Sequence, residues 1–126
     1  MQLTELPGIY AVARAGPAAP VPANILDGPG FRTVARTDEE LSVVAPQSEI
    51  SGMDTVDGGW TCFKLQGPFA FDETGIIHTI SAPLAEARIG IFTVATFDTD
   101  YVLVKQKDAA AAVDLWRTEG HEITAA

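Results

Sequence analysis

Phe31-Arg-Thr-Val-Ala-Arg-Thr-Asp-Glu-Glu-Leu-Ser-Val-Val44 lines up without a gap on Ile91-Phe-Thr-Val-Ala-Thr-Phe-Asp-Thr-Asp-Tyr-Val-Leu-Val104. Thr-Val-Ala, an Asp and the final Val are identical in the two stretches. Each copy has the pattern of a strand, a tight polar turn and a second strand. Because an internal repeat shows how a chain is divided, this one predicts two small α+β modules in tandem.

The repeat extends upstream to a first strand in each copy. Residues 9–15 and residues 60–66 each end at a Gly-Pro pair. Only 13 residues separate the first Gly-Pro from its second strand, against 22 in the other copy. The shorter connection contains three prolines and two glycines, which limit helix there to about one turn. We therefore expect a truncated module in residues 1–57 and a complete one in residues 58–126.

Two helices are predicted in the second module. Apolar residues at helical spacing predict a helix from Ile76 to about residue 87 with its apolar face on a sheet. Pro83 predicts a bend or a restart within this helix. A second helix is expected at 108–118, with Asp108 as its N-cap and Gly120 as its end.

The strands of the second module complete an order found in a known architecture. We expect a first strand at 60–66, a hairpin of 89–96 and 101–105, and a short last strand at 121–124. With the two helices this gives β-α-β-β-α-β, the ferredoxin-like arrangement. The predicted fold class is thus α+β, with antiparallel sheets that carry their helices on one face.

Composition limits the partners and the compartment. The 126 residues include 17 acidic and eight basic side chains, a net charge of -9, which repels both nucleic acid and anionic membranes. No run approaches the roughly 18 apolar residues needed to cross a bilayer, and the amino terminus lacks the pattern of a signal peptide. We expect a cytoplasmic protein.

Catalytic and metal chemistry have little support in the sequence. The single Cys62 lies in a strand-like run, where a small buried side chain explains it. His78 and His121 have no partner at a metal-ligand spacing. The chain contains no recognisable catalytic triad, P-loop or dinucleotide-binding motif. The interpretation is a protein that is not an enzyme and holds no cofactor or metal.

Three stretches of the second half resemble an ACT domain: Gly67-Pro-Phe-Ala-Phe-Asp-Glu-Thr-Gly-Ile-Ile77, Ser81-Ala-Pro-Leu-Ala85 and Ile89 to Val104. The branch that they resemble contains small tandem-ACT proteins related to the carboxy-terminal part of bacterial aspartate kinase and to the cytosolic arginine sensor of animals. This resemblance implies a regulatory, allosteric module that binds a small molecule, usually an amino acid, at an interface between two modules. It also implies a homodimer, because ACT modules pair.

The residues themselves predict where such a ligand binds. Gly67 and Gly75 bracket a loop that leads into a helix, and the amino terminus of a helix attracts a carboxylate. Glu73 and Asp100 are expected at the same place, where paired carboxylates would bind an ammonium or guanidinium group. A zwitterion, including one with a cationic side chain, fits this pattern.

The resemblance places ligand contacts on particular residues. They are Ala70, Glu73, Ile77, Thr96, Phe97 and Asp100. Each also has a purely structural interpretation: residues 72–74 could cap the helix, and Asp98 and Asp100 could be turn residues, which we favour for Asp98. The aromatic residues, among them Phe97, could belong to the core or an interface.

The first module departs from this binding pattern. Where the second copy has Thr96-Phe97 and Asp100, the gapless alignment places Arg36-Thr37 and Glu40. Arg32 and Arg36 share one strand face and are expected in solvent, paired with acidic side chains or in an oligomer contact. The functional hypothesis is a sensor of a free amino acid. The alternative is a ligand-free structural or protein-interaction module that mediates oligomerisation.

Overall fold

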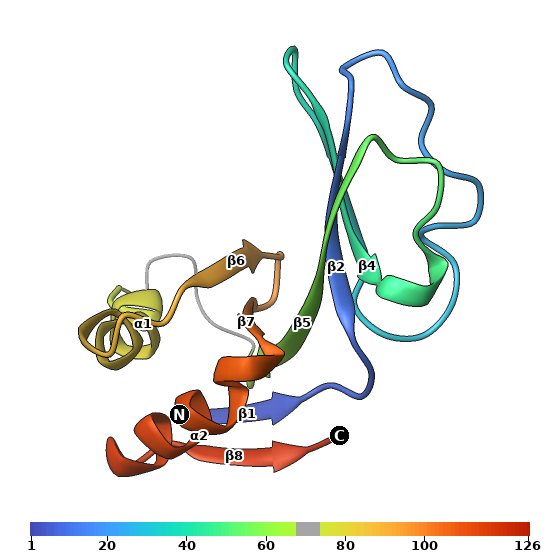
Figure 1. Ribbon diagram of the computed structural model, residues 1–126. Helices are drawn as coiled ribbons and strands as arrows, with labels where there is room; N and C mark the ends of the chain where they lie inside the picture. Colours follow the sequence, from blue (N-terminus) through green and yellow to red (C-terminus); the bar gives the residue numbers. More distant parts are fainter. Residues whose placement is uncertain (68–73) are drawn as a thin grey trace. The chain divides into compact units, whose positions relative to one another are not determined.

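The computed structural model describes residues 1–67 and 74–126, which form two compact units (Figure 1). We call Met1–Pro7 with Thr61–Ala126 the helical unit and Gly8–Trp60 the β unit. The strands are β1 Gln2–Glu5, β2 Tyr10–Ala15, β3 Thr33–Arg36, β4 Leu41–Pro46, β5 Thr55–Leu65, β6 Ile91–Ala95, β7 Asp100–Lys105 and β8 Glu122–Ala125. The helices are α1 Ile76–Glu86, α2 Gln106–Thr118 and the 3-10 helix Gln47–Glu49. The domain boundary between residues 57 and 58 stays a prediction.

The helical unit has the predicted ferredoxin-like order. Along the chain it runs from the end of β5 through α1, β6, β7 and α2 to β8. In space the strands follow the order β6-β7-β5-β1-β8. The sequence analysis missed β1, which is antiparallel to β5 and parallel to β8 and so separates the first and last strands of the predicted set. The predicted last strand at 121–124 is present as β8.

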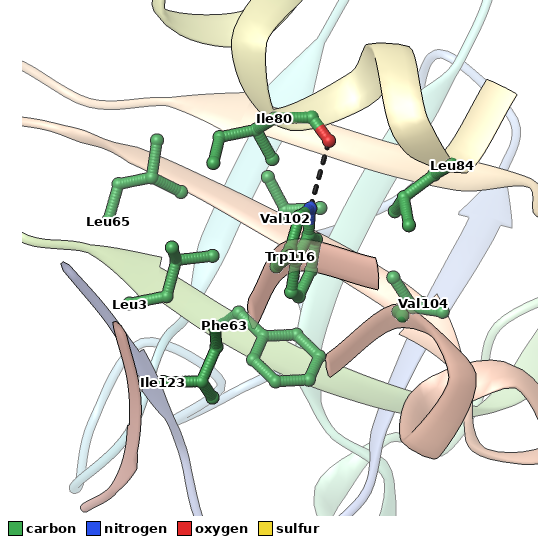
Figure 2. Packing of buried hydrophobic residues seen from close by; sticks show 10 residues of the cluster. Leu3, Phe63, Leu65, Ile80, Leu84, Val102, Val104, Trp116 and Ile123 are labelled. Atoms are coloured by element: carbon green, nitrogen blue, oxygen red, sulfur yellow. Dashed lines mark hydrogen bonds between the residues drawn. The ribbon is translucent and has the colours of Figure 1, made fainter. Parts of the chain in front are cut away.

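One hydrophobic core joins both helices to one face of this sheet. Trp116 of α2 lies at its centre, edge-on to Phe63 with the ring centroids 5.0 Å apart, and its indole N–H donates to the Ile80 carbonyl at 2.9 Å (Figure 2). The two helices supply further members, and each strand contributes alternate residues, because successive side chains of a strand point to opposite faces. The buried members are Leu3, Phe63, Leu65, Ile80, Leu84, Val102, Val104, Ala112, Trp116 and Ile123.

The β unit contains four antiparallel strands in the order β3-β4-β2-β5. A ferredoxin-like sheet has this same spatial order when its strands are numbered along the chain from β2, the first, to β5, the fourth. Within residues 8–60, all of which the structure describes, there is no α-helix, as the prolines predicted. Instead, Ile25 from the connection between β2 and β3 packs in a core with Ala15, Leu41, Val43 and Ala45.

Two arginines of the β unit hold that connection in place. Arg32 donates to the carbonyls of Ile25 and Pro29, each at 3.1 Å, and forms an ion pair with Glu49. Arg36 donates to the carbonyls of residues 17 and 19. Of the expected alternatives, pairing with an acidic side chain is therefore right for Arg32, and exposure to solvent is right for Arg36, which donates to backbone carbonyls.

The helix ends differ in detail from the prediction. α1 runs without interruption through Pro83, so the expected restart is absent. α2 begins directly after β7 with Lys105 as its N-cap, so the assignment of Asp108 as N-cap is wrong, although that carboxylate still lies in the first turn. The predicted end at Gly120 is confirmed. The Gly120 N–H donates to the Arg117 carbonyl, and the His121 N–H donates to the Trp116 carbonyl. These two bonds with a left-handed glycine (φ 90°) form a Schellman motif.

The repeated hairpins are both present, but the gapless alignment is one residue out at their turns. Each hairpin has a four-residue loop, closed by the pair Arg36 and Leu41 in one and Ala95 and Asp100 in the other. Asp100 therefore corresponds to Leu41, not to Glu40. Apart from the added strand β1, the sheets of the two units have the same strand order. No helix among the described residues is both long enough and apolar enough to span a bilayer.

Replacing Trp116 by Phe should destabilise the helical unit. The variant loses the indole hydrogen bond to Ile80 and leaves space beside Phe63, which should cost about 1–3 kcal/mol. Urea unfolding followed by circular dichroism measures this. Trp60→Phe is the control, because its indole donates to the Asp57 carbonyl at a partly buried site, and we expect a smaller loss. Equal losses would contradict the central position of Trp116.

Candidate functional site

A small cavity lies where β5 ends beside the turn between β6 and β7. Its volume is about 170 Å³, and it is lined by Lys64, Gly67, Asp98 and Thr99. All four residues belong to the helical unit. Clefts for drug-sized ligands are typically ~300–1,000 Å³, so this cavity suits a smaller molecule or part of one.

Gly67 brings the end of β5 into close contact with the turn. A Cβ at this position would lie 2.7 Å from the Asp98 carbonyl oxygen and 2.9 Å from the Thr99 Cβ. Both distances are too short for carbon, and neither neighbouring atom sits at the flexible end of a side chain. Only glycine therefore allows the two backbone segments to approach this closely.

Hydrogen bonds of Thr96 and Thr99 hold the turn rigid. The Thr99 hydroxyl is buried and donates to the Leu65 carbonyl at 2.7 Å, which ties the turn to β5. The Thr99 carbonyl accepts both the backbone N–H of Thr96 at 2.8 Å and its hydroxyl at 2.9 Å. Because its partners are all within the protein, Thr99 forms a fixed wall of the cavity.

The structure brings three of the expected ligand contacts together on this turn. Thr96 and Phe97 lie in the loop, and Asp100 is the first residue of β7, half-buried and paired with Ala95. The Phe97 side chain is 78% exposed. Ile77 lies elsewhere, half-buried in the first turn of α1. Ala70 and Glu73 lie outside the described residues, so their predicted roles stay predictions.

The amino terminus of α1 differs from the expected capped helix. Its N-cap is Gly75 in a left-handed conformation (φ 77°), with no side-chain hydrogen bond at the cap. The Gly75 carbonyl instead accepts the backbone N–H and the hydroxyl of Thr79, at 2.9 and 2.8 Å. Thr74 is therefore not the cap, and the two acidic candidates for that role, at 72 and 73, fall outside the described residues.

Three of the described cavity residues are absent from the contacts expected from the sequence. Lys64 lies within the strand predicted at 60–66, and Asp98 and Thr99 lie in the predicted hairpin turn. The available signal was strand alternation: Phe63 and Leu65 are fully buried in the core, so Lys64 between them must point to the other face of the sheet. Asp98 lines the cavity because the folded chain brings its turn against Gly67.

Cys62 and His121 lie outside the cavity, and their surroundings shift their pKa values. Burial raises the pKa of the Cys62 thiol to about 12, so it stays protonated at neutral pH and is a poor nucleophile. Burial, followed by the charge of the chain's amino terminus, lowers the pKa of His121, whose Nδ1 lies 3.0 Å from the Met1 amino nitrogen. Among the described residues there is no group of three His, Cys, Asp or Glu side chains that could hold a metal ion.

Comparison with known families identifies the second half of the chain. A family model of the ACT domain matches residues 55–117, which is half of the chain. The chain belongs to the ACT domain family. Its ACT domain contains β5 to α2 and so includes all four residues of the cavity. A second family model, that of an N-terminal domain, matches residues 8–53.

Individual relatives of this ACT protein share different amounts of it. The cytosolic arginine sensor for mTORC1 subunit 1 of Rattus norvegicus is 32% identical over 57 residues, which are 44% of this chain and 17% of the sensor. A solved structure from Agrobacterium tumefaciens is 44% identical, with a TM-score of 0.90 over 99% of this chain and 92% of that one. Aspartate kinase of Clostridium acetobutylicum shares the fold, with 14% identity and a TM-score of 0.63 over 92% of this chain and 33% of the kinase.

Replacing Gly67 by Ala should displace the turn and damage the site. The added Cβ would overlap the backbone of Asp98, so we expect a loss of about 1–3 kcal/mol in unfolding free energy. Gly16→Ala is the matched control. Gly16 is the glycine of the other Gly-Pro pair, and a Cβ there meets no atom within 4 Å. Thermal and urea unfolding of both variants provide the measurement. Equal stability of the two would show that the close contact at Gly67 is not required.

Proposed function

We propose that this ACT protein is a regulatory, non-catalytic module that binds a free amino acid beside the turn of residues 96–100. The cavity at the end of β5 carries the proposal, because Asp98 and Thr99 of this turn line it, although none of the expected contact residues is among its described lining residues. A named relative is a cytosolic arginine sensor, which supports an amino acid as ligand and the cytoplasm as compartment. An allosteric role follows if binding changes assembly or a partner's activity.

The acidic residues of the turn favour a ligand with a positive charge. Asp98 and Asp100 are both on this turn, and Asp100 is half-buried at the start of β7. A carboxylate that is partly removed from water gains more from a charged partner than a fully solvated one does. We therefore propose that Asp100 contacts an ammonium or guanidinium group and that Phe97 supplies an apolar wall.

We further propose that a second copy of the chain completes the site. Phe97 is 78% exposed, although burial of a Phe side chain typically contributes about 1.5–3 kcal/mol. The cavity is also small and open to solvent, so one chain encloses little of a ligand. A facing module would cover both the ring and the ligand. The same exposed Phe97 supports the alternative function, a ligand-free module in which this surface serves oligomerisation alone.

Thermal unfolding with each of the twenty L-amino acids tests the ligand proposal. A ligand at a hundred times its dissociation constant should add about 2.7 kcal/mol of stability. We expect Asp100→Asn to remove the response, and Asp114→Asn, an exposed change on α2, to leave it intact. The proposal fails if no amino acid at millimolar concentration raises the midpoint, or if the Asp100 variant responds like the natural protein.

Light scattering at micromolar protein concentrations tests the assembly. We expect a mass of twice 13.3 kDa. Phe97→Ser should weaken the dimer roughly tenfold or more, because each tenfold corresponds to about 1.4 kcal/mol. Leu26→Ser, at another exposed apolar side chain, is the control and should leave the mass unchanged. A monomer mass at every concentration would exclude the dimer. Dimerisation that depends on Phe97 but on no ligand would favour the alternative function.

A further inference from the structure

Two of the described residues that line the cavity beside β5 carry charges, and neither has an ion-pair or hydrogen-bond partner among the described residues. The Thr99 hydroxyl donates to the Leu65 carbonyl, and the Thr99 carbonyl accepts from the Thr96 hydroxyl. The Gly67 carbonyl accepts from the Gln66 side-chain amide at 3.4 Å. These residues therefore shape the cavity but have little left to offer a ligand. The other lining residues that the structure describes are Lys64 and Asp98, one cationic and one anionic.

Lys64 is held at the cavity by its neighbours on β5. Phe63 and Leu65 are fully buried on the core face, and Lys64 pairs with Thr4 of β1 in the antiparallel register. Alternation then directs the Lys64 side chain away from the core, and it is half-buried. Moving this charge elsewhere would require a change in the register of β5, so Lys64 is a fixed feature of the site.

Lys64 and Asp98 line the same cavity without forming a direct ion pair. An ion pair would bring an ammonium nitrogen within 4.0 Å of a carboxylate oxygen, and the described residues show none for either side chain. Lys64 is half-buried and Asp98 is exposed, and a ligand that carries both signs can pair with both side chains. Charge-assisted hydrogen bonds of this kind are about twice as strong as neutral ones.

We propose that Lys64 binds the α-carboxylate, and Asp98 the α-ammonium group, of a free amino acid. This inference rests on the proposed function and makes it more specific: the site recognises the zwitterionic end common to all amino acids. Amines without a carboxylate, and residues inside a peptide, then lack one or both of the required charges and bind poorly.

The local cation also explains how an acidic protein binds a carboxylate at all. The chain has a net charge of -9, and its overall field repels anions. A single ammonium within hydrogen-bond distance outweighs that field, because salt screens charges that lie more than about 8 Å away at physiological ionic strength. Lys64 is the only cationic residue among the lining side chains that the structure describes.

The test compares each L-amino acid with its carboxamide, in which a neutral amide replaces the carboxylate. With the natural protein, titration calorimetry should show at least tenfold weaker binding of the carboxamide. Lys64→Met should weaken binding of the amino acid at least tenfold and leave binding of the carboxamide unchanged. Lys64→Arg should retain the preference for the carboxylate. Lys107→Met, on the exposed first turn of α2, is the matched control and should behave like the natural protein.

Asp98 is tested with ligands that lack the α-amino group. Asp98→Asn should weaken binding of the amino acid and leave binding of its desamino analogue unchanged. The inference is overturned, with the proposed function intact, if amino acids bind but the carboxamides bind equally well, or if Lys64→Met keeps the full preference for the carboxylate. If the natural protein binds no amino acid, the inference and the proposed function fail together.

Discussion

The hydrogen bond from the Thr99 hydroxyl to the Leu65 carbonyl, with the bare backbone of Gly67 beside it, is the constraint on which the site depends. It fastens a surface turn to the end of a central strand whose preceding residues are buried in the core. Turns are normally among the more mobile parts of a protein, and binding groups on them are only as well placed as their support. In this protein the turn is held to β5 by the buried hydrogen bond from Thr99 to Leu65 and by the close approach that Gly67 allows.

The two units show how one strand order serves two different purposes. Both have ferredoxin-like sheets, but only the helical unit covers its sheet with helices. The β unit uses Ile25 on an irregular connection, which Arg32 fastens through two carbonyls and Glu49. At the hairpin turn it has the buried Leu41 where the helical unit has Asp100. A side chain that fills a core cannot also bind a charged ligand, so Leu41 cannot take the role proposed for Asp100.

The sequence predicted the elements with strong periodicity and missed those without it. Both helices and both hairpins were found because their apolar residues repeat at the right spacing, whereas the four residues of β1 are too few to show a pattern. The Asp108 cap was wrong because β7 passes directly into α2, which no local signal marks. Lys64 and Asp98 are 34 positions apart and have no shared motif. Only the contact at Gly67, a property of the folded chain, makes them neighbours of one cavity.

Charge acts in this protein on two length scales, and the two have separate roles in selecting a ligand. The excess of acidic residues extends over the whole surface and raises the local concentration of cations, whatever their shape. Lys64 and Asp98 act only within the cavity, where a zwitterion satisfies both and a simple cation leaves Lys64 unpaired. Discrimination of this kind depends on the cost of an unpaired polar group more than on added attraction. On the proposed function, the overall field would favour amino acids with cationic side chains, and Lys64 with Asp98 would require the zwitterionic end of the ligand.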